Sequence, residues 1–283
     1  MSVIRQIGHA TDTGRKRRRN EDDYVVEPPL FAVADGMGGA QAGELASSLA
    51  ADALRDDRDE SGSGERRVVE LIQEANRRVY QRSNEDATVS GMGTTMTVAL
   101  VEDGRVSFGH VGDSRAYLIR DGTLEQLTED HSLVAELVRS GQLSPEEAET
   151  HPQRSVITRA LGSDPDVDVD TFSINAQPDD VFMICSDGLT SMVDDDLILR
   201  TVEKNRGDLK RAAKALIGAA NKRGGEDNIT IIFFEIGEDY GEPLEETARY
   251  PVVTDGHDVL ADDEETLDET DRVPAVDTMV LGP

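Results

Sequence analysis

The stretch that decides the fold is FAVADGMGGAQAGELASS, residues 31–48. Its apolar start, residues 31–34, predicts a short strand, and the small residues of 41–55 predict a helix. Asp35 and Gly36 then lie where the strand gives way to the helix, at the mouth of a sheet. The glycines that follow Asp35 leave room for an ion or a phosphate beside the backbone. Asp-Gly is also common turn chemistry, so the stretch alone is equally compatible with a plain turn.

The rest of the chain predicts an α+β fold in which helices pack on antiparallel sheets. Two Asp-Gly pairs, 103–104 and 121–122, interrupt runs of β-branched and aromatic residues and predict hairpin turns. Other strands are expected at 3–12, 181–188 and 229–236, and other helices at 66–84, 133–140, after Ser144, 194–203 and 209–221. The last strand is apolar at nearly every position, which predicts a place in the centre of a sheet.

Composition narrows the possible functions. The chain has 283 residues, 37% of them hydrophobic, and a net charge of −29. Such an acidic protein is a poor partner for nucleic acid and a better one for divalent cations and basic segments. The sequence contains no apolar run long enough for a membrane span and no signal peptide, so a cytoplasmic protein is expected. The single cysteine, Cys185, excludes an intrachain disulfide.

The C-terminal residues 237–283 differ from the rest. They contain 15 acidic and two basic residues, which gives this segment a net charge of −13. Its acidity and scarcity of aromatic residues predict a disordered tail. The threonines among these acids leave two roles open, a solubilising end or a segment that a kinase phosphorylates.

Four carboxylates share one kind of position. Each lies at the end of a strongly apolar strand or just before one: Asp35, Asp113, Asp187 and Asp227. Any one of them alone is explained by a turn, but strand ends meet at sheet edges, so all four are expected to converge. Oxygen ligands of this kind suit Mg²⁺ or Mn²⁺. Zinc is not expected, because the five histidines show no ligand spacing. The GxxxxGK[ST] loop of nucleotide hydrolases is absent as well.

Eight segments in order carry a resemblance to a known family. They are GRKRRRNED, ADGMGG, GMGTT, GHVGDSR, TEDHS, HPQRSVITRALG, CSDGL and GGEDNIT, within residues 11–236. Together they resemble the bacterial form of the metal-dependent protein serine/threonine phosphatases of type 2C. The resemblance implies a two-sheet antiparallel β-sandwich flanked by helices, with a small flap at about residues 139–162. It also implies a catalytic domain at 1–236, followed by the acidic tail at 237–283.

The resemblance implies roles for individual residues. They are Glu21, Asp35, Gly36, Asp187 and Asp227 for two Mn²⁺ or Mg²⁺ ions, Asp113 for a possible third ion, and Arg17 for the substrate phosphate. Asp35 would bridge the two ions, and the Gly36 carbonyl would bind one of them. A guanidinium suits the phosphate role because it holds two oxygens at once.

Two positions depart from the family pattern. Met37 stands where animal members carry a histidine proposed as general acid, so the leaving alkoxide must take its proton from water or another group. Ser191 stands where many members carry an acid, which puts the third ion in question but not the two central ones.

The function implied is hydrolysis of phosphoserine and phosphothreonine in proteins, by direct attack of a hydroxide that bridges two metal ions. Phosphorylated proteins and serine/threonine kinases are the expected partners, and a monomer is expected. A pseudophosphatase that only binds phosphoproteins is one alternative, although Asp35, Asp187 and Asp227 are all present. A small-molecule phosphatase and an acidic cation-binding structural protein are the others.

Overall fold

The structure is a computed structural model that describes residues 4–38, 42–57 and 62–238. The chain divides into two units, Met1–Glu245 and Glu246–Pro283. The second unit lies outside the described residues, and so does the predicted acidic tail from residue 239 onward. None of the helices in the described part of the chain combines the length and the apolar character of a membrane span.

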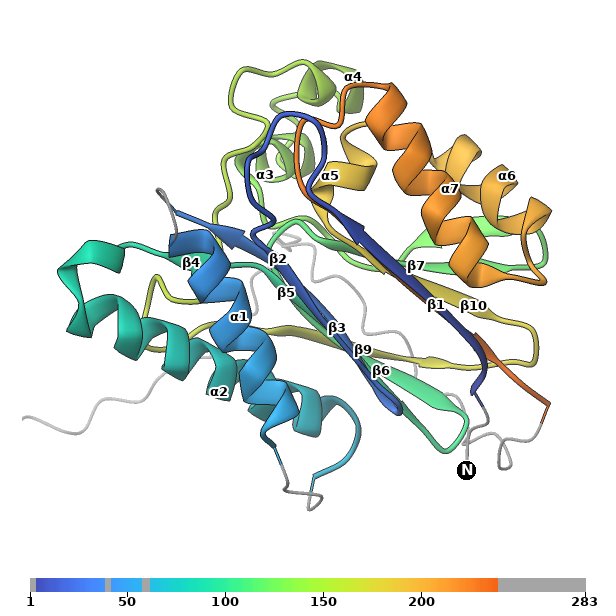
Figure 1. The fold of residues 1–283 in the computed structure, drawn as a ribbon, viewed down its shortest axis with the longest axis horizontal. Helices are drawn as coiled ribbons and strands as arrows, with labels where there is room; N and C mark the ends of the chain where they lie inside the picture. The colour runs from blue at the N-terminus through green and yellow to red at the C-terminus, as the bar shows by residue number, and fades with distance from the viewer. Residues whose placement is uncertain (1–3, 39–41, 58–61, 239–283) are drawn as a thin grey trace, which may run out of the picture. The chain divides into compact units, whose positions relative to one another are not determined.

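Two antiparallel sheets form the centre of the first unit (Figure 1). The first sheet has the order β1 (Ile4–Asp12), β11 (Ile229–Ile236), β10 (Val181–Cys185), β7 (Arg115–Arg120) and β8 (Thr123–Gln126). The second has the order β2 (Asp22–Glu27), β3 (Leu30–Met37), β5 (Met96–Glu102), β6 (Arg105–Val111) and β9 (Asp170–Asn175), and the short β4 (Gly93–Thr94) pairs with β3. The predicted two-sheet sandwich is confirmed.

Helices cover the outer face of each sheet. The second sheet is covered by α1 (Ala42–Arg55) and α2 (Gly64–Glu85), which leads into a short 3-10 turn, η1 (Ala87–Val89). The first sheet is covered by α5 (Asp187–Thr190), α6 (Asp195–Lys204) and α7 (Leu209–Lys222). Two further helices, α3 (Leu133–Arg139) and α4 (Pro145–Glu149), belong to the segment between β8 and β9. The helix expected after Ser144 is α4, and Ser144 caps it and forms a capping box with Glu147.

The apolar residues form three layers of core. Phenylalanines fill the space between the sheets, where Phe31 and Phe234 stack with ring centroids 4.4 Å apart. Each outer layer lies between one sheet and its helices. In α1 the layer uses fully buried alanines, such as Ala46 and Ala50, which let the helix pack closely on β3. Every residue of β11 is buried, as its composition predicted, because β11 lies between β1 and β10.

The hairpin predictions are confirmed by backbone geometry. Asp103 and Gly104 connect β5 to β6 with φ values of 42° and 79°, and Asp121 and Gly122 connect β7 to β8 with 51° and 72°. Two successive positive φ values are the signature of the tight type I′ hairpin. Asp tolerates this region and Gly adopts it freely, which explains the choice of residues.

Several details differ from the sequence predictions. The strand expected at 181–188 ends at Cys185, and Asp187 begins the helix α5. The strand that begins near Phe31 does not stop at Ala34 but continues to Met37, so Asp35 and Gly36 lie inside β3 and form no turn. Gly36 pairs there with Thr94 of β4, a strand too short to recognise from sequence. The strand β9 was not predicted, because it is a partly buried edge strand without an apolar run.

Candidate metal and phosphate site

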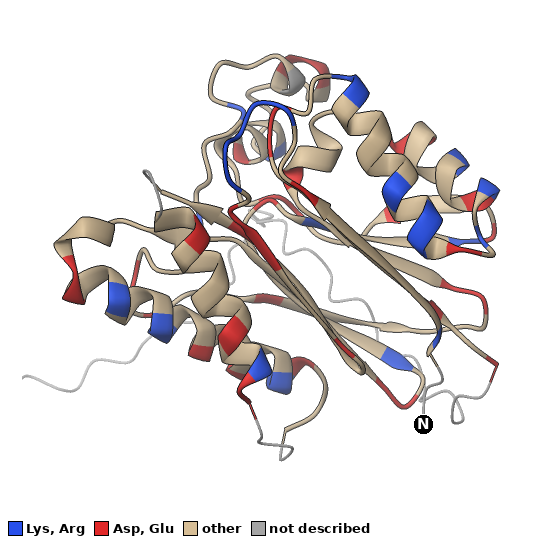
Figure 2. Ribbon diagram, viewed as in Figure 1, with Lys and Arg blue, Asp and Glu red and all other residues tan. Residues whose placement is uncertain are grey.

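The predicted carboxylates gather at one end of the sandwich. Asp35 lies on β3, Asp113 lies two residues after the end of β6, Asp187 begins α5 two residues after β10, and Asp227 lies two residues before β11. Figure 2 shows acidic segments (red) meeting at this end of the sheets, next to the basic loop (blue). The sandwich therefore brings together side chains that lie up to 192 positions apart (Asp35 to Asp227).

Asp35 is strongly affected by its neighbours in the cluster. Loss of water and the nearby Asp22, Asp187 and Asp113 raise the pKa of Asp35 well above its usual range. The carboxyl groups of Asp35 and Asp187 are close enough to influence each other's pKa. Burial and the charge of Asp227 raise the pKa of Asp187 to about 6. Mutual repulsion of this kind is relieved when a cation binds among the carboxylates.

Asp113 belongs to the same cluster. It is buried, with 9% of its surface exposed. Burial and the charge of Asp187 raise its pKa to about 7. Ser191, where an acid would have strengthened a third ion site, is exposed at the C-terminal end of α5. Asp113 thus faces the central carboxylates, and Ser191 supplies no charge to it.

Asp22 is a member of the cluster that sequence reasoning missed. It is the register partner of Asp35 across β2 and β3. Its Oδ2 accepts hydrogen bonds from Ser186 Oγ (2.8 Å) and Thr230 Oγ1 (2.6 Å), while its Oδ1 is buried without a hydrogen-bond partner among the described residues. Burial is the largest cause that raises the pKa of Asp22 to about 7. The feature that could have identified Asp22 is its position on β2, the strand that pairs with the strand of Asp35.

Glu21 and the Gly36 carbonyl meet beside α1. A Cβ added to Gly43 would lie within 3.0 Å of both Glu21 Oε2 and the Gly36 carbonyl oxygen. The Gly36 amide donates to the Glu21 carbonyl at 3.1 Å. Burial is the largest cause that raises the pKa of Glu21. Glycines at 36 and 43 are therefore required by the close approach of three backbone segments.

A substitution tests this close approach. We expect Gly36→Ala to destabilise the protein by about 3 kcal/mol, because the new methyl would collide with the Gly43 and Glu21 carbonyls. The matched control is Gly218→Ala in α7, where a Cβ meets nothing within 4 Å. It should stabilise the protein by about 1 kcal/mol through helix propensity. Urea unfolding measures both; equal effects of the two substitutions would contradict the packing argument.

Arg17 reaches into the cluster from the loop before β2. Its Nη2 lies 2.7 Å from Asp227 Oδ2. Asn228, a second residue that sequence reasoning missed, holds this loop in place. Its Nδ2 donates to the carbonyls of Thr13 and Arg19, each at 2.9 Å, and its Oδ1 accepts from the Glu21 amide at 2.7 Å. The position of Arg17 is thus set by a buried amide next to Asp227.

The donor atoms fit a hard divalent cation. All the side chains concerned offer carboxylate oxygens, and two of these, Asp22 Oδ1 and Asp187 Oδ1, are buried without a hydrogen-bond partner in the described residues. No three His, Cys, Asp or Glu side chains within residues 4–38, 42–57 and 62–238 already stand in a complete ligand arrangement. Oxygen donors with this charge suit Mg²⁺ or Mn²⁺.

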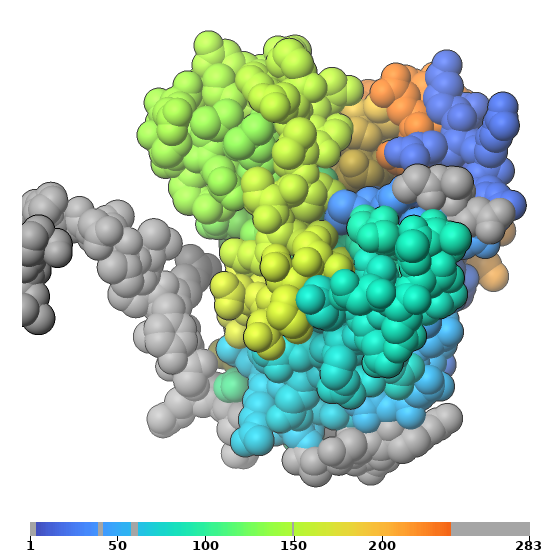
Figure 3. Space-filling view, turned by 90° about the vertical axis from the view of Figure 1, so that its left-hand side faces the viewer, coloured from blue at the N-terminus to red at the C-terminus, as the bar shows by residue number. Residues whose placement is uncertain are grey.

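A pocket opens beside Met37, the residue that follows Gly36. It has a volume of about 220 Å³, and residues 157–168 supply most of its lining. These residues continue from the predicted flap, and in Figure 3 the green and yellow-green segments lie on the same face as the teal α2. Arg159, in the lining, pairs with Asp170, which also accepts a hydrogen bond from His131. A substrate bound at the carboxylates would have this pocket beside it.

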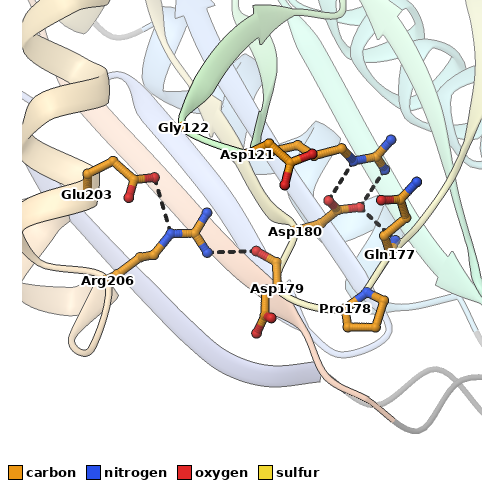
Figure 4. Close-up of a pocket in the computed structure, with 9 residues that line it drawn as sticks. Asp121, Gly122, Gln177, Pro178, Asp179, Asp180, Glu203 and Arg206 are labelled. Carbon is orange, nitrogen blue, oxygen red and sulfur yellow. Dashed lines mark hydrogen bonds and ion pairs between the residues drawn. The ribbon is translucent and has the colours of Figure 1, made fainter.

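A second pocket, of about 230 Å³, lies at the other end of β10 (Figure 4). Its walls include Asp179 and Asp180, which precede β10, whereas Asp187 follows it. The polar groups there are already paired. Arg120 binds both carboxylate oxygens of Asp180, and Arg206 contacts Glu203 and the Asp179 carbonyl. These contacts tie β7, and the loop that follows α6, to the segment that precedes β10, which is a structural role.

The chain is similar to known proteins in both sequence and fold. Residues 15–227 match the family described as protein phosphatase 2C. The serine/threonine phosphatase stp of Listeria welshimeri is 41% identical over 236 residues, which cover 80% of this chain and 93% of that protein. The crystal structure of the serine/threonine phosphatase PstP/Ppp of Mycobacterium tuberculosis has a TM-score of 0.79 at 36% identity and covers 83% of this chain and 100% of that chain. A structure of the PstP catalytic domain with 2 manganese ions has a TM-score of 0.76 at 34% identity and covers 82% and 98%.

Proposed function

The chain belongs to the protein phosphatase 2C family of metal-dependent serine/threonine phosphatases, and we propose that it hydrolyses phosphoserine and phosphothreonine in proteins. The observation that supports this best is the convergence of Asp35, Asp113, Asp187 and Asp227 at one end of the sandwich, next to Arg17. A carboxylate cluster beside a guanidinium combines a site for cations with a site for phosphate.

We assign the residues as follows. Asp35 lies beside the other carboxylates and would contact both central ions. The Gly36 carbonyl and Glu21 would bind one ion. Asp187 and Asp227 would bind the other ion. The ions, Mn²⁺ or Mg²⁺, would activate water for direct attack on phosphorus and neutralise developing charge. Asp113 would hold a third ion where one binds.

Arg17 would hold the substrate phosphate. Its guanidinium can donate two parallel hydrogen bonds to phosphate oxygens, and its contact with Asp227 keeps it at the reaction centre. Ion binding at Asp227 would free the guanidinium for the phosphate. Met37 offers no proton, so the departing alkoxide would take its proton from water or another group.

The domain limits follow from the resemblance to the phosphatase family. We propose residues 1–236 as the catalytic domain, 139–162 as a flap beside the substrate, and 237–283 as an acidic tail. The enzyme would act on phosphorylated proteins in the cytoplasm and oppose serine/threonine kinases. Turnover of a phosphothreonine peptide with Mn²⁺, lost on chelation and restored by Mn²⁺, tests the proposal. Activity that persists in chelator would overturn it.

Substitution of Arg17 separates phosphate binding from metal binding. We expect Arg17→Ala to lower kcat/KM for a phosphopeptide about 100-fold, because a donor to the transferring phosphoryl group is lost. Arg17→Lys should recover little of this, since an ammonium cannot hold two oxygens in parallel. Mn²⁺ affinity, measured by calorimetry, should not fall, because Arg17 competes for Asp227. A parallel loss of Mn²⁺ affinity would contradict the assignment.

A further inference from the structure

The loop that carries Arg17 is basic at five successive positions, residues 15–19. Two of these cations already have acidic partners: Arg17 pairs with Asp227, and Arg19 pairs with Glu44 at 3.1 Å. The other three, Arg15, Lys16 and Arg18, are exposed and form no ion pair with any residue that the structure describes. Unpaired cations this close together are unusual in a protein with a net charge of −29.

The loop presents these cations at a defined place. The amides of Arg15 and Lys16 both donate to the Gly225 carbonyl, at 2.7 and 3.2 Å. At the other end, Asn228 Nδ2 donates to the Arg19 carbonyl. A charged group on an anchored backbone loses less conformational entropy when it binds a ligand than one on a free tail does. The loop is therefore built to bind rather than only to solubilise.

The three cations flank the phosphate-binding residue. Lys16 and Arg18 are the chain neighbours of Arg17 and Arg15 lies two positions before it, so the Cα atoms of all three lie within about 8 Å of the Arg17 Cα. In an extended peptide, residues two or three apart are separated by about 7–10 Å. Figure 2 shows the blue loop directly beside the acidic end of the sheets. A second anionic group two or three residues from the reacting phosphate would thus reach the loop.

We propose that Arg15, Lys16 and Arg18 form a docking subsite for a second phosphoryl group, so that the enzyme prefers protein segments phosphorylated at two nearby residues. This inference rests on the proposed function. A phosphoryl group carries about −1.5 to −2 charges and three acceptor oxygens, so it gains more from a cluster of cations than a carboxylate does. The group docked here is not hydrolysed; the one at Arg17 and the carboxylates is.

The test uses the full chain and three peptides of one sequence. One carries a single phosphothreonine, the second carries another phosphothreonine two residues away, and the third has glutamate at that second place. Para-nitrophenyl phosphate, too small to reach the subsite, reports whether the chain is a phosphatase at all. The quantity measured is the ratio of kcat/KM for the doubly to the singly phosphorylated peptide. We expect about tenfold, as three exposed ion pairs would give.

The combined variant Arg15→Gln, Lys16→Gln, Arg18→Gln should bring this ratio close to one. The control removes the same charge elsewhere, by Lys210→Gln, Arg211→Gln and Lys214→Gln on exposed positions of α7. Position 210 lies about 18 Å along the helix from Lys222, which is next to the loop's anchor. The control should keep the wild-type ratio, and raising the salt concentration should lower the ratio in wild type.

Several results would overturn the proposal. They are a wild-type ratio near one, a ratio that the loop variant retains, and an equal gain from the glutamate peptide. If neither the peptides nor para-nitrophenyl phosphate is hydrolysed, the proposed function fails instead. Docking is then decided by fluorescence anisotropy, where about tenfold tighter binding of the doubly phosphorylated peptide, lost in the loop variant, supports the subsite and equal binding refutes it.

Discussion

Replacing Asp187 by Asn should lower kcat/KM for a phosphothreonine peptide roughly a thousandfold, or about 4 kcal/mol of transition-state stabilisation. Asp187 lies beside the carboxylates of Asp35 and Asp227 and has one buried oxygen without a partner in the described chain. Asn keeps the size of the side chain but removes its charge and one acceptor oxygen. The loss should appear at saturating Mn²⁺, since the amide cannot replace the anion as a ligand.

The control for Asp187→Asn is Asp196→Asn in the first turn of α6, which is exposed and forms no ion pair with a described residue. Its activity should equal that of wild type. Thermal unfolding of both variants in chelator distinguishes lost chemistry from lost structure. Wild-type activity in Asp187→Asn would refute the site, and so would an equal loss in Asp196→Asn. The test can tell lost chemistry from lost structure, because metal-free Asp187→Asn has lost a buried charge that its neighbours repel. This variant should therefore be at least as stable as wild type.

Local patterns predicted most of the fold. Asp-Gly pairs predicted both hairpins, and the apolar run at 229–236 predicted a central strand, because turn geometry and burial depend on adjacent residues. The same logic failed for Asp35 and Gly36. Their strand continues because β4 pairs with it, and β4 lies almost 60 residues further along the chain. The strand β9 was not predicted for a related reason. It is an edge strand, and pairing with its neighbour β6 specifies it more than its own composition does.

The site residues also divide into those that local sequence predicted and one that it did not. Asp35, Asp113, Asp187 and Asp227 each stand beside an apolar strand, and this common context predicted that they converge. Asp22 has no such context, because it lies within a run of three acids that resembles a solvated loop. What sets Asp22 apart is contact with Ser186 and Thr230, and these contacts exist only after the two sheets have packed together.

The burial of Asp113 beside other carboxylates predicts an unusual dependence of stability on pH. In chelator, we expect Asp113→Asn to be more stable than wild type, and the difference in unfolding free energy should grow by about 3 kcal/mol from pH 5 to pH 8. The folded-state pKa of Asp113 is raised from 3.8 to about 7. Wild type therefore loses stability as the pH rises through this window, since the unfolded chain ionises first. Asn does not titrate, so the variant loses nothing from this position.

Comparison with wild type at each pH removes the effects of other groups. Burial lowers the pKa of His110 to about 4, and this histidine destabilises the fold on acidification, but equally in both proteins. Urea unfolding at a series of pH values measures the difference, with Asp196→Asn as the control for loss of a surface charge. Saturating Mn²⁺ should shrink or reverse the gain, because the cation stabilises the ionised carboxylates of wild type. A difference that stays constant with pH would show that Asp113 is not held among like charges. The same burial and repulsion that weaken the metal-free fold would favour the binding of a cation among these carboxylates.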